Sequence, residues 1–191
     1  LLYTLLAVIG FVFFDRAGVV IYYLPIINTL FALGTVLILR KLCLEYGVGK
    51  IPASLAAIFL AFVPVTAFWA ASGMDTSLNT MLEMSSVLTV FMAGKCESAP
   101  RKILTALSTL VLLLVMTRPD GFLLPLCVTA FLGISKGKWK AAMAVLIPLL
   151  ICTVILASWR YWYYGQPLPN TVYVRVAGSL TERLIAGYGN W

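Results

Sequence analysis

The chain has 191 residues, of which 62% are hydrophobic and 11% charged, with no histidine, a net charge of +7 and a mean hydropathy of +1.00. Soluble domains carry about 25% charged residues, and one of this size cannot bury so much apolar surface. The composition excludes a soluble enzyme, a secreted disulfide scaffold and a disordered chain. Without histidine, the chain also cannot use a Ser/His/Asp triad or a His-ligated metal.

Apolar runs bounded by charges and turn residues predict the helices in chain order. They cover residues 1–14, 19–39, 51–71, 77–92, 103–117, 122–134 and 141–159. Runs of 19 or more residues cross a core of about 30 Å at about 1.5 Å per residue, and three of the seven are that long. The run 1–14 is either a truncated span or an interfacial helix. We expect an all-α, polytopic transmembrane bundle of about six or seven helices, in a sequence that begins within an apolar run and is an internal fragment.

Basic residues predict the orientation. They cluster in three short connections, which contain Arg40, Lys41 and Lys50; Lys95, Arg101 and Lys102; and Lys136, Lys138 and Lys140. An even number of predicted spans separates these connections, so the positive-inside rule places residues 40–50, 93–102 and 135–140 in the cytoplasm. The charges have no stacking aromatics between them, so no nucleic-acid partner is expected. No CxxC pair occurs, and no metal site is predicted.

The junction at residues 117–121 is the most informative. Two full crossings need about 40 residues, whereas the two arms and their turn have only 32, from 103 to 134. Pro119 ends the first helix and Gly121 permits a reversal, so Arg118 and Asp120 should lie at a tip within the membrane. Such a tip is tolerated where it lines a cavity. The alternative is that Arg118 reaches the headgroups and pairs with Asp120.

Two further polar segments face the same side in this topology. In the first, at residues 72–76, Asp75 either caps the next helix or takes part in a site, and Glu83 lies two turns further on. The second covers residues 158–175, where Trp159 and Trp162 are typical of an interfacial aromatic belt. The remainder of that segment combines turn residues with polar groups flanked by two arginines.

Taken together, the three segments resemble one family. Ser72-Gly73-Met74-Asp75-Thr76, Thr117-Arg118-Pro119-Asp120-Gly121 and Arg160 with Tyr163-Tyr164-Gly165 and Pro169-Asn170-Thr171 are similar to motifs of the GT-C superfamily of polytopic glycosyltransferases. The resemblance is to the bacterial, arabinofuranosyltransferase-like branch and, more distantly, to protein O-mannosyltransferases. It covers residues 72–175 and implies a multi-pass enzyme of the bacterial inner membrane with an extracytoplasmic active face.

The resemblance implies transfer of a sugar from a polyprenyl-phosphate donor to a hydroxyl of a glycan, lipid or protein acceptor. Arg118 would hold the lipid phosphate, and Asp75 and Asp120 would orient a substrate or Arg118. Further substrate contacts would come from Arg160, Tyr164, Asn170 and Arg175. No cofactor is firmly implied, and a divalent cation is left open.

Asp75 stands where glutamate is commoner in the family, and Arg175 stands where lysine is usual. The general base of the superfamily lies in a first outward loop, which we expect upstream of Leu1, so this fragment alone should be inactive. Residues 1–175 would form the transmembrane domain, and 176–191 would begin an outward segment. The alternative function is a secondary transporter, or a flippase for lipid-linked sugars, with an outward-open polar cavity.

Overall fold

A computed structural model of the chain describes residues 2–15, 18–96, 100–135 and 137–165. These residues form helices and connections and contain no strand, as expected for an all-α protein. In chain order the elements are α1 (Leu2–Phe13), η1 (Val19–Tyr23), α3 (Leu24–Glu45), α4 (Lys50–Phe62), α5 (Pro64–Ala71), α6 (Thr76–Lys95), α7 (Arg101–Thr117), η2 (Pro119–Phe122), α8 (Leu123–Ala130), η3 (Phe131–Ser135) and α9 (Trp139–Tyr164).

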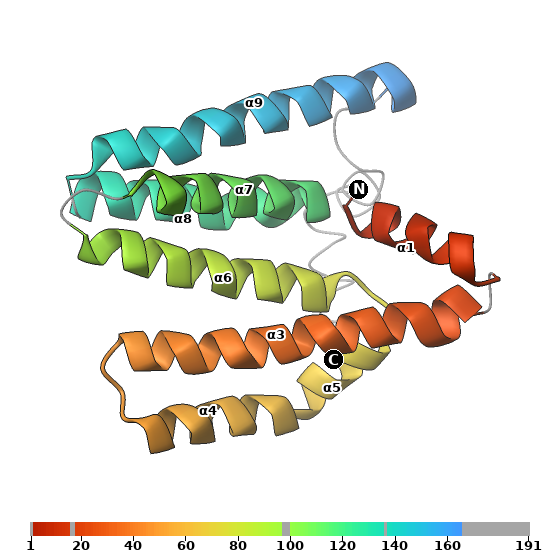
Figure 1. The fold of residues 1–191 in the computed structure, drawn as a ribbon. Coiled ribbons are helices and arrows are strands. Elements are labelled where there is room, and N and C mark those ends of the chain that lie inside the picture. Colours follow the sequence, from red (N-terminus) through yellow and green to blue (C-terminus); the bar gives the residue numbers. More distant parts are fainter. Residues whose placement is uncertain (1, 16–17, 97–99, 136, 166–191) are drawn as a thin grey trace, which may run out of the picture. The chain divides into compact units, whose positions relative to one another are not determined.

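The chain divides into two compact units, Leu1–Cys152 and Thr153–Trp191, with the boundary inside α9. In the first unit α3 lies alongside α6, and α6 lies alongside α7 (Figure 1). The larger apolar core joins α6, α7, α8 and the first half of α9. It includes Val90, Leu107, Val111, Val128, Leu132, Val145 and Leu149.

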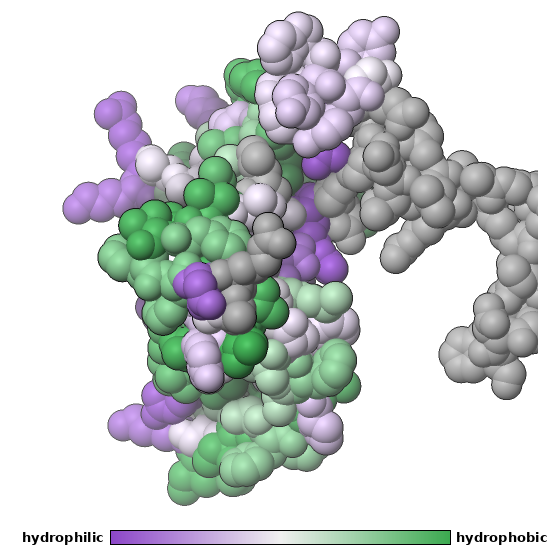
Figure 2. Space-filling model, turned by 90° about the vertical axis from the view of Figure 1, so that its right-hand side faces the viewer, coloured by the Kyte–Doolittle hydropathy of each residue, from purple (hydrophilic) through white to green (hydrophobic). Residues whose placement is uncertain are grey.

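Large apolar side chains are exposed along the outer faces of these helices. Phe62 is 81% exposed and Ile51 is 76% exposed. Apolar residues cover much of the surface in Figure 2, where hydrophilic residues form separate groups. Monomeric soluble proteins rarely expose apolar areas this extensive, so the surface fits contact with lipid.

In the described part of the chain, two helices are long and apolar enough to cross a membrane, Val19–Glu45 and Trp139–Tyr164. The pair α4 and α5 would supply a third span if it is counted as one bent segment. The remaining helices are shorter or more polar: α7 has 17 residues, and the 20 residues of α6 include Asn79, Glu83 and several hydroxyls. The total of six or seven membrane helices therefore stays a prediction.

Several expected helices differ from those observed. The helix expected over 19–39 continues to Glu45, so Arg40 and Lys41 lie on α3 and not in a connection. Residues 51–71 were expected to form one span, but α4 and α5 meet at an angle of 56°. Pro64 begins α5 and Val63 before it is extended, because a residue that precedes proline is disfavoured in the α conformation. The helix expected to end at Trp159 continues to Tyr164, since the first strong helix breaker is Gly165, whose φ is +71°.

The three basic connections lie at one end of the first unit, on the left in Figure 1. Two long-range contacts hold them together. Lys95 Nζ lies 3.0 Å from Glu45 Oε2, and Lys138 Nζ donates to the carbonyls of Ala93, Gly94 and Cys96 at the end of α6. A lysine at a helix C-terminus supplies the donors that the last carbonyls lack and complements the helix dipole. The structure thus gathers the basic connections at one end, as an even number of crossings between them requires.

Candidate functional site

Arg118 and Asp75 form an ion pair between two helix junctions. Arg118 Nε donates to Asp75 Oδ2 at 3.2 Å, across 43 residues of sequence. Their side chains are 38% and 28% exposed, so the pair is neither fully buried nor fully solvated. Of the sequence-predicted site residues, these two are the ones that the structure brings into contact. The pair lies at the end of the helices opposite the basic connections (Figure 1).

The local sequence explains how each charge reaches this position. Arg118 follows the last residue of α7 and is extended (φ −135°, ψ 148°), because Pro119 disfavours the α conformation before it. Asp75 occupies the N-cap position of α6, but its side chain makes no capping hydrogen bond. Its carboxylate binds the guanidinium instead, so the capping alternative for Asp75 is not what the structure shows.

The pairing leaves part of the guanidinium available. The contact to Asp75 uses Nε, and among the described residues the two terminal nitrogens of Arg118 have no hydrogen bond. A guanidinium fork binds the oxygens of a phosphate or carboxylate in a bidentate manner. Asp75 therefore fixes one edge of the arginine and leaves the guanidinium fork without a partner among the described residues.

Two residues that sequence reasoning missed hold the turn before Asp75. The Tyr3 hydroxyl donates to the Gly73 carbonyl at 2.7 Å. The Asn28 amide donates both to Tyr3 Oη at 3.0 Å and to the Met74 carbonyl at 2.8 Å. Asn28 is fully buried, and a polar residue inside a long apolar run was the one signal that could have singled it out.

Glu83 is engaged within its own helix. Asn79 Nδ2 donates to Glu83 Oε1 at 2.7 Å, one turn apart on α6. Asn79 is 7% exposed, and its Oδ1 has no partner among the described residues. Asp75, Asn79 and Glu83 are spaced four residues apart, so they share one face of the helix.

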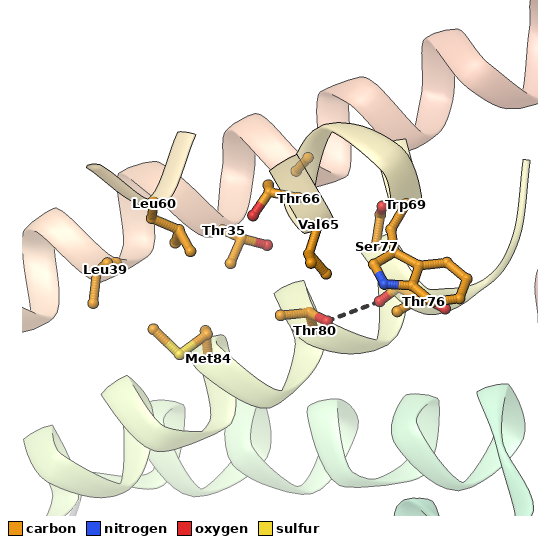
Figure 3. Close-up of a pocket in the computed structure, with 11 residues that line it drawn as sticks. Thr35, Leu39, Leu60, Val65, Thr66, Trp69, Thr76, Ser77, Thr80 and Met84 are labelled. Atoms are coloured by element: carbon orange, nitrogen blue, oxygen red, sulfur yellow. Dashed lines mark hydrogen bonds between the residues drawn. The ribbon is translucent and has the colours of Figure 1, made fainter. Parts of the chain in front are cut away.

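A cavity of about 520 Å³ lies on α6 between α3, α4 and α5 (Figure 3). Its lining is mostly apolar with five hydroxyl side chains, from Thr35, Thr66, Thr76, Ser77 and Thr80. Thr76, which lines the cavity, directly follows Asp75 of the ion pair in sequence. A volume of this size is typical of small-molecule and cofactor sites.

The other predicted site residues either belong to the second unit or lie, wholly or in their side chains, outside the described part of the chain. Arg160 and Tyr164 lie on the part of α9 in the second unit, where Trp159 stacks on Tyr163 with centroids 5.8 Å apart and Tyr164 packs edge-on against both. The side chain of Asp120 lies outside the described part of the chain, as do residues Asn170 and Arg175. The expected alternative, in which Arg118 pairs with Asp120, lies outside the described residues, whereas the pairing with Asp75 is present.

The chain was compared with protein-family models, curated proteins and solved structures. No family model matches it, and no curated protein or solved structure is measurably similar.

Proposed function

We propose that the chain belongs to an integral membrane glycosyltransferase, which transfers a sugar from a polyprenyl-phosphate donor to an acceptor hydroxyl outside the cytoplasm. The observation that carries the proposal is the Arg118–Asp75 pair, in which the arginine is held at its Nε edge and its side chain is 38% exposed. Phosphate is the leaving group of such a transfer. A fixed cation beside it stabilises the negative charge that develops as the bond to the sugar breaks.

The proposed topology has about six or seven membrane helices, with the basic connections inside. In that arrangement the Arg118–Asp75 pair faces the outer side, because it lies opposite the basic end (Figure 1). Donors on polyprenyl carriers present their phosphate at the membrane surface. An arginine at a short helix junction is suited to meet such a headgroup without leaving the protein.

The other predicted residues have roles in the same proposal. Asp75 orients Arg118, and Asp120 orients a substrate or Arg118. Arg160, Tyr164, Asn170 and Arg175 contact the sugar or the acceptor. The acceptor hydroxyl belongs to a glycan, a lipid or a protein, and the proposal does not require a divalent cation.

A secondary transporter or a flippase is the second candidate, and one observation favours it. α4 and α5 form a bent pair beside the cavity, and broken helices at membrane depth mark substrate sites in transporters. The glycosyltransferase is preferred over a transporter of uncharged solutes because a guanidinium fork binds anionic groups. It is preferred over a flippase because the three polar segments resemble glycosyltransferase motifs. Uptake or translocation of a lipid-linked sugar in proteoliposomes, without transfer, would favour the second candidate.

The phosphate assignment is tested by comparing binding of polyprenyl phosphate with binding of the uncharged polyprenol of equal length. Both are titrated into the chain in phosphatidylcholine nanodiscs and measured by native mass spectrometry. We expect the chain to prefer the phosphate. Arg118→Ala should reduce that preference about ten- to hundredfold, since hydrogen bonds to charged groups contribute about 1.5–3 kcal/mol. Arg118→Lys should retain part of it, because lysine keeps the charge but loses the fork.

The matched control is Arg40→Ala, which removes an exposed arginine at the basic end. It should leave the preference unchanged. An undiminished preference in Arg118→Ala would overturn the phosphate assignment. Release of polyprenyl phosphate from a sugar-loaded donor in the presence of acceptor then tests the transfer itself.

A further inference from the structure

We propose that the cavity between α3, α4, α5 and α6 binds an uncharged amphiphile from the bilayer, with an oxygen-bearing head and a hydrocarbon chain. This binding site is independent of the proposed sugar transfer. It uses a different flank of α6 from the one that contributes to the larger core with α7 and α8. The proposal rests on the polarity gradient, the free donors and the charge of the lining.

The lining changes character along its length. Trp69, Thr76 and Ser77 lie at one end, whereas Leu39, Leu60 and Met84 lie at the other (Figure 3). From Ser77 to Met84 the α6 backbone rises by about 10 Å, at about 1.5 Å per residue. The polar end lies next to the α5–α6 turn, and the apolar end is deeper along the helices. Such a gradient fits a molecule with a polar head at one end and an apolar chain at the other.

The polar end offers hydrogen-bond donors. Thr35 donates to the Phe31 carbonyl and Thr80 to the Thr76 carbonyl. In the described part of the chain, by contrast, the hydroxyls of Thr66, Thr76 and Ser77 donate to no protein group. Hydroxyls both donate and accept, so they can bind ether, ester or hydroxyl oxygens of a ligand head.

The charge of the lining selects an uncharged head. Among the described residues that line the cavity, none is ionisable. The nearest charge along the chain is Asp75, whose carboxylate is engaged by Arg118. A charged head in this cavity would be desolvated without a charged partner among the described lining residues, which is costly. A neutral head loses less on leaving water and gains hydrogen bonds from the free hydroxyls.

The volume allows part of a lipid to enter. At about 30 Å³ for each water molecule in the liquid, 520 Å³ corresponds to roughly 17 waters. That space accommodates a small head with the first part of a single chain. The apolar end then contributes through burial of hydrocarbon, at about 25 cal/mol per Å².

Trp69 is a built-in probe of this site. The other four tryptophans, at positions 139, 159, 162 and 191, are replaced by phenylalanine so that Trp69 alone fluoresces. Phosphatidylcholine vesicles containing the protein are titrated with a monoacylglycerol whose acyl chain is dibrominated at its second and third carbons, next to the head. Bromine quenches tryptophan at contact, and Trp69 lies at the polar end of the cavity. A lysophosphatidic acid with the same brominated chain provides the anionic comparison. We expect saturable quenching by the monoacylglycerol at a mole fraction about tenfold below that needed for the anionic lipid.

Paired variants test the hydroxyls. Thr66→Val with Ser77→Ala should weaken monoacylglycerol quenching about tenfold, whereas Thr29→Val should not change it, since the Thr29 hydroxyl is exposed and binds the Pro25 carbonyl. If the double variant loses its helical circular dichroism, Ala32→Leu, which fills the cavity, takes its place and should abolish the saturable component. Quenching that rises linearly with mole fraction, equal affinities for both lipids, or binding unaffected by Ala32→Leu would each overturn the proposal.

Discussion

The side-chain amide of Asn28 donates a 2.8 Å hydrogen bond to the Met74 carbonyl, and so joins α3 to the residue immediately before Asp75. The same amide donates to Tyr3 Oη, and Tyr3 in turn donates to the Gly73 carbonyl. Two segments far from the turn in sequence, in α1 and α3, therefore hold it in place. That turn determines where the carboxylate of Asp75 meets Arg118.

Asn28→Leu should destabilise the protein by about 1–3 kcal/mol. The change removes two hydrogen bonds and leaves the Met74 carbonyl without its donor, although it also removes the buried, unpartnered Oδ1 of Asn28. Unfolding in mixed micelles of a mild detergent and dodecyl sulfate, followed by circular dichroism, measures the loss. The neighbouring Thr29→Val is the control, with an expected change within about 0.5 kcal/mol. Equal effects of the two variants would contradict the role of Asn28.

Gly121→Ala should be more damaging than a glycine substitution elsewhere. A Cβ at position 121 would lie 2.5 Å from the Leu114 carbonyl oxygen, which is backbone and cannot rotate away. Overpacking of this kind costs about 1–3 kcal/mol. At Gly49 the nearest atom would be Pro52 Cδ at 3.6 Å, which is ordinary contact, so Gly49→Ala should be tolerated. A comparison of thermal unfolding midpoints checks both, and a midpoint for Gly121→Ala no lower than for Gly49→Ala would show that the α7–η2 turn is loosely packed.

Lys138→Met should destabilise the end of α6 by about 2 kcal/mol. The ammonium is part-buried and donates to the carbonyls of Ala93, Gly94 and Cys96, which have no donors within the helix. Methionine keeps the length of the side chain but makes none of these bonds. Hydrogen exchange of amides in the last turns of α6 should accelerate in this variant and not in Lys140→Met, which alters an exposed lysine nearby. Unchanged exchange in Lys138→Met would refute this capping role.

The Asp75–Arg118 pair should contribute little to stability. Half-exposed ion pairs are worth about 0–1 kcal/mol, because solvent screens them. A double-mutant cycle with Asp75→Asn and Arg118→Gln should give a coupling free energy of unfolding of at most about 1 kcal/mol. The same variants should nevertheless impair binding of polyprenyl phosphate. A coupling energy well above this value would instead assign the pair to the fold.

Much of the helical organisation follows from local sequence. Apolar runs locate the helices, and Pro119 ends α7 where expected. The break at Pro64 was also accessible from the sequence, since proline in the middle of a run of helix length predicts a kink. The end of α9 was misplaced because the apolar run stops at the charged residue Arg160, although arginine, tyrosine and tryptophan are all compatible with a helix that continues to the next glycine.

The contacts of the site were less accessible. Turn residues and short arms singled out Arg118 and Asp75 separately, but their pairing depends on how α6 packs against α7. Tyr3 and Asn28 gave no local pattern, because a single hydroxyl or amide in an apolar run does not reveal its partner. The cavity depends on the angle between α4 and α5, which no spacing in the sequence determines.

An unbroken series of contacts runs from Tyr3 and Asn28 to the Gly73–Met74 backbone, then to Asp75 and Arg118. The position of the guanidinium thus depends on residues of α1 and α3, which lie far earlier in the chain than the α7–η2 junction where Arg118 is found. A substitution remote from Arg118 can therefore weaken the binding of an anion by this residue, even when every sequence neighbour of Arg118 is unchanged.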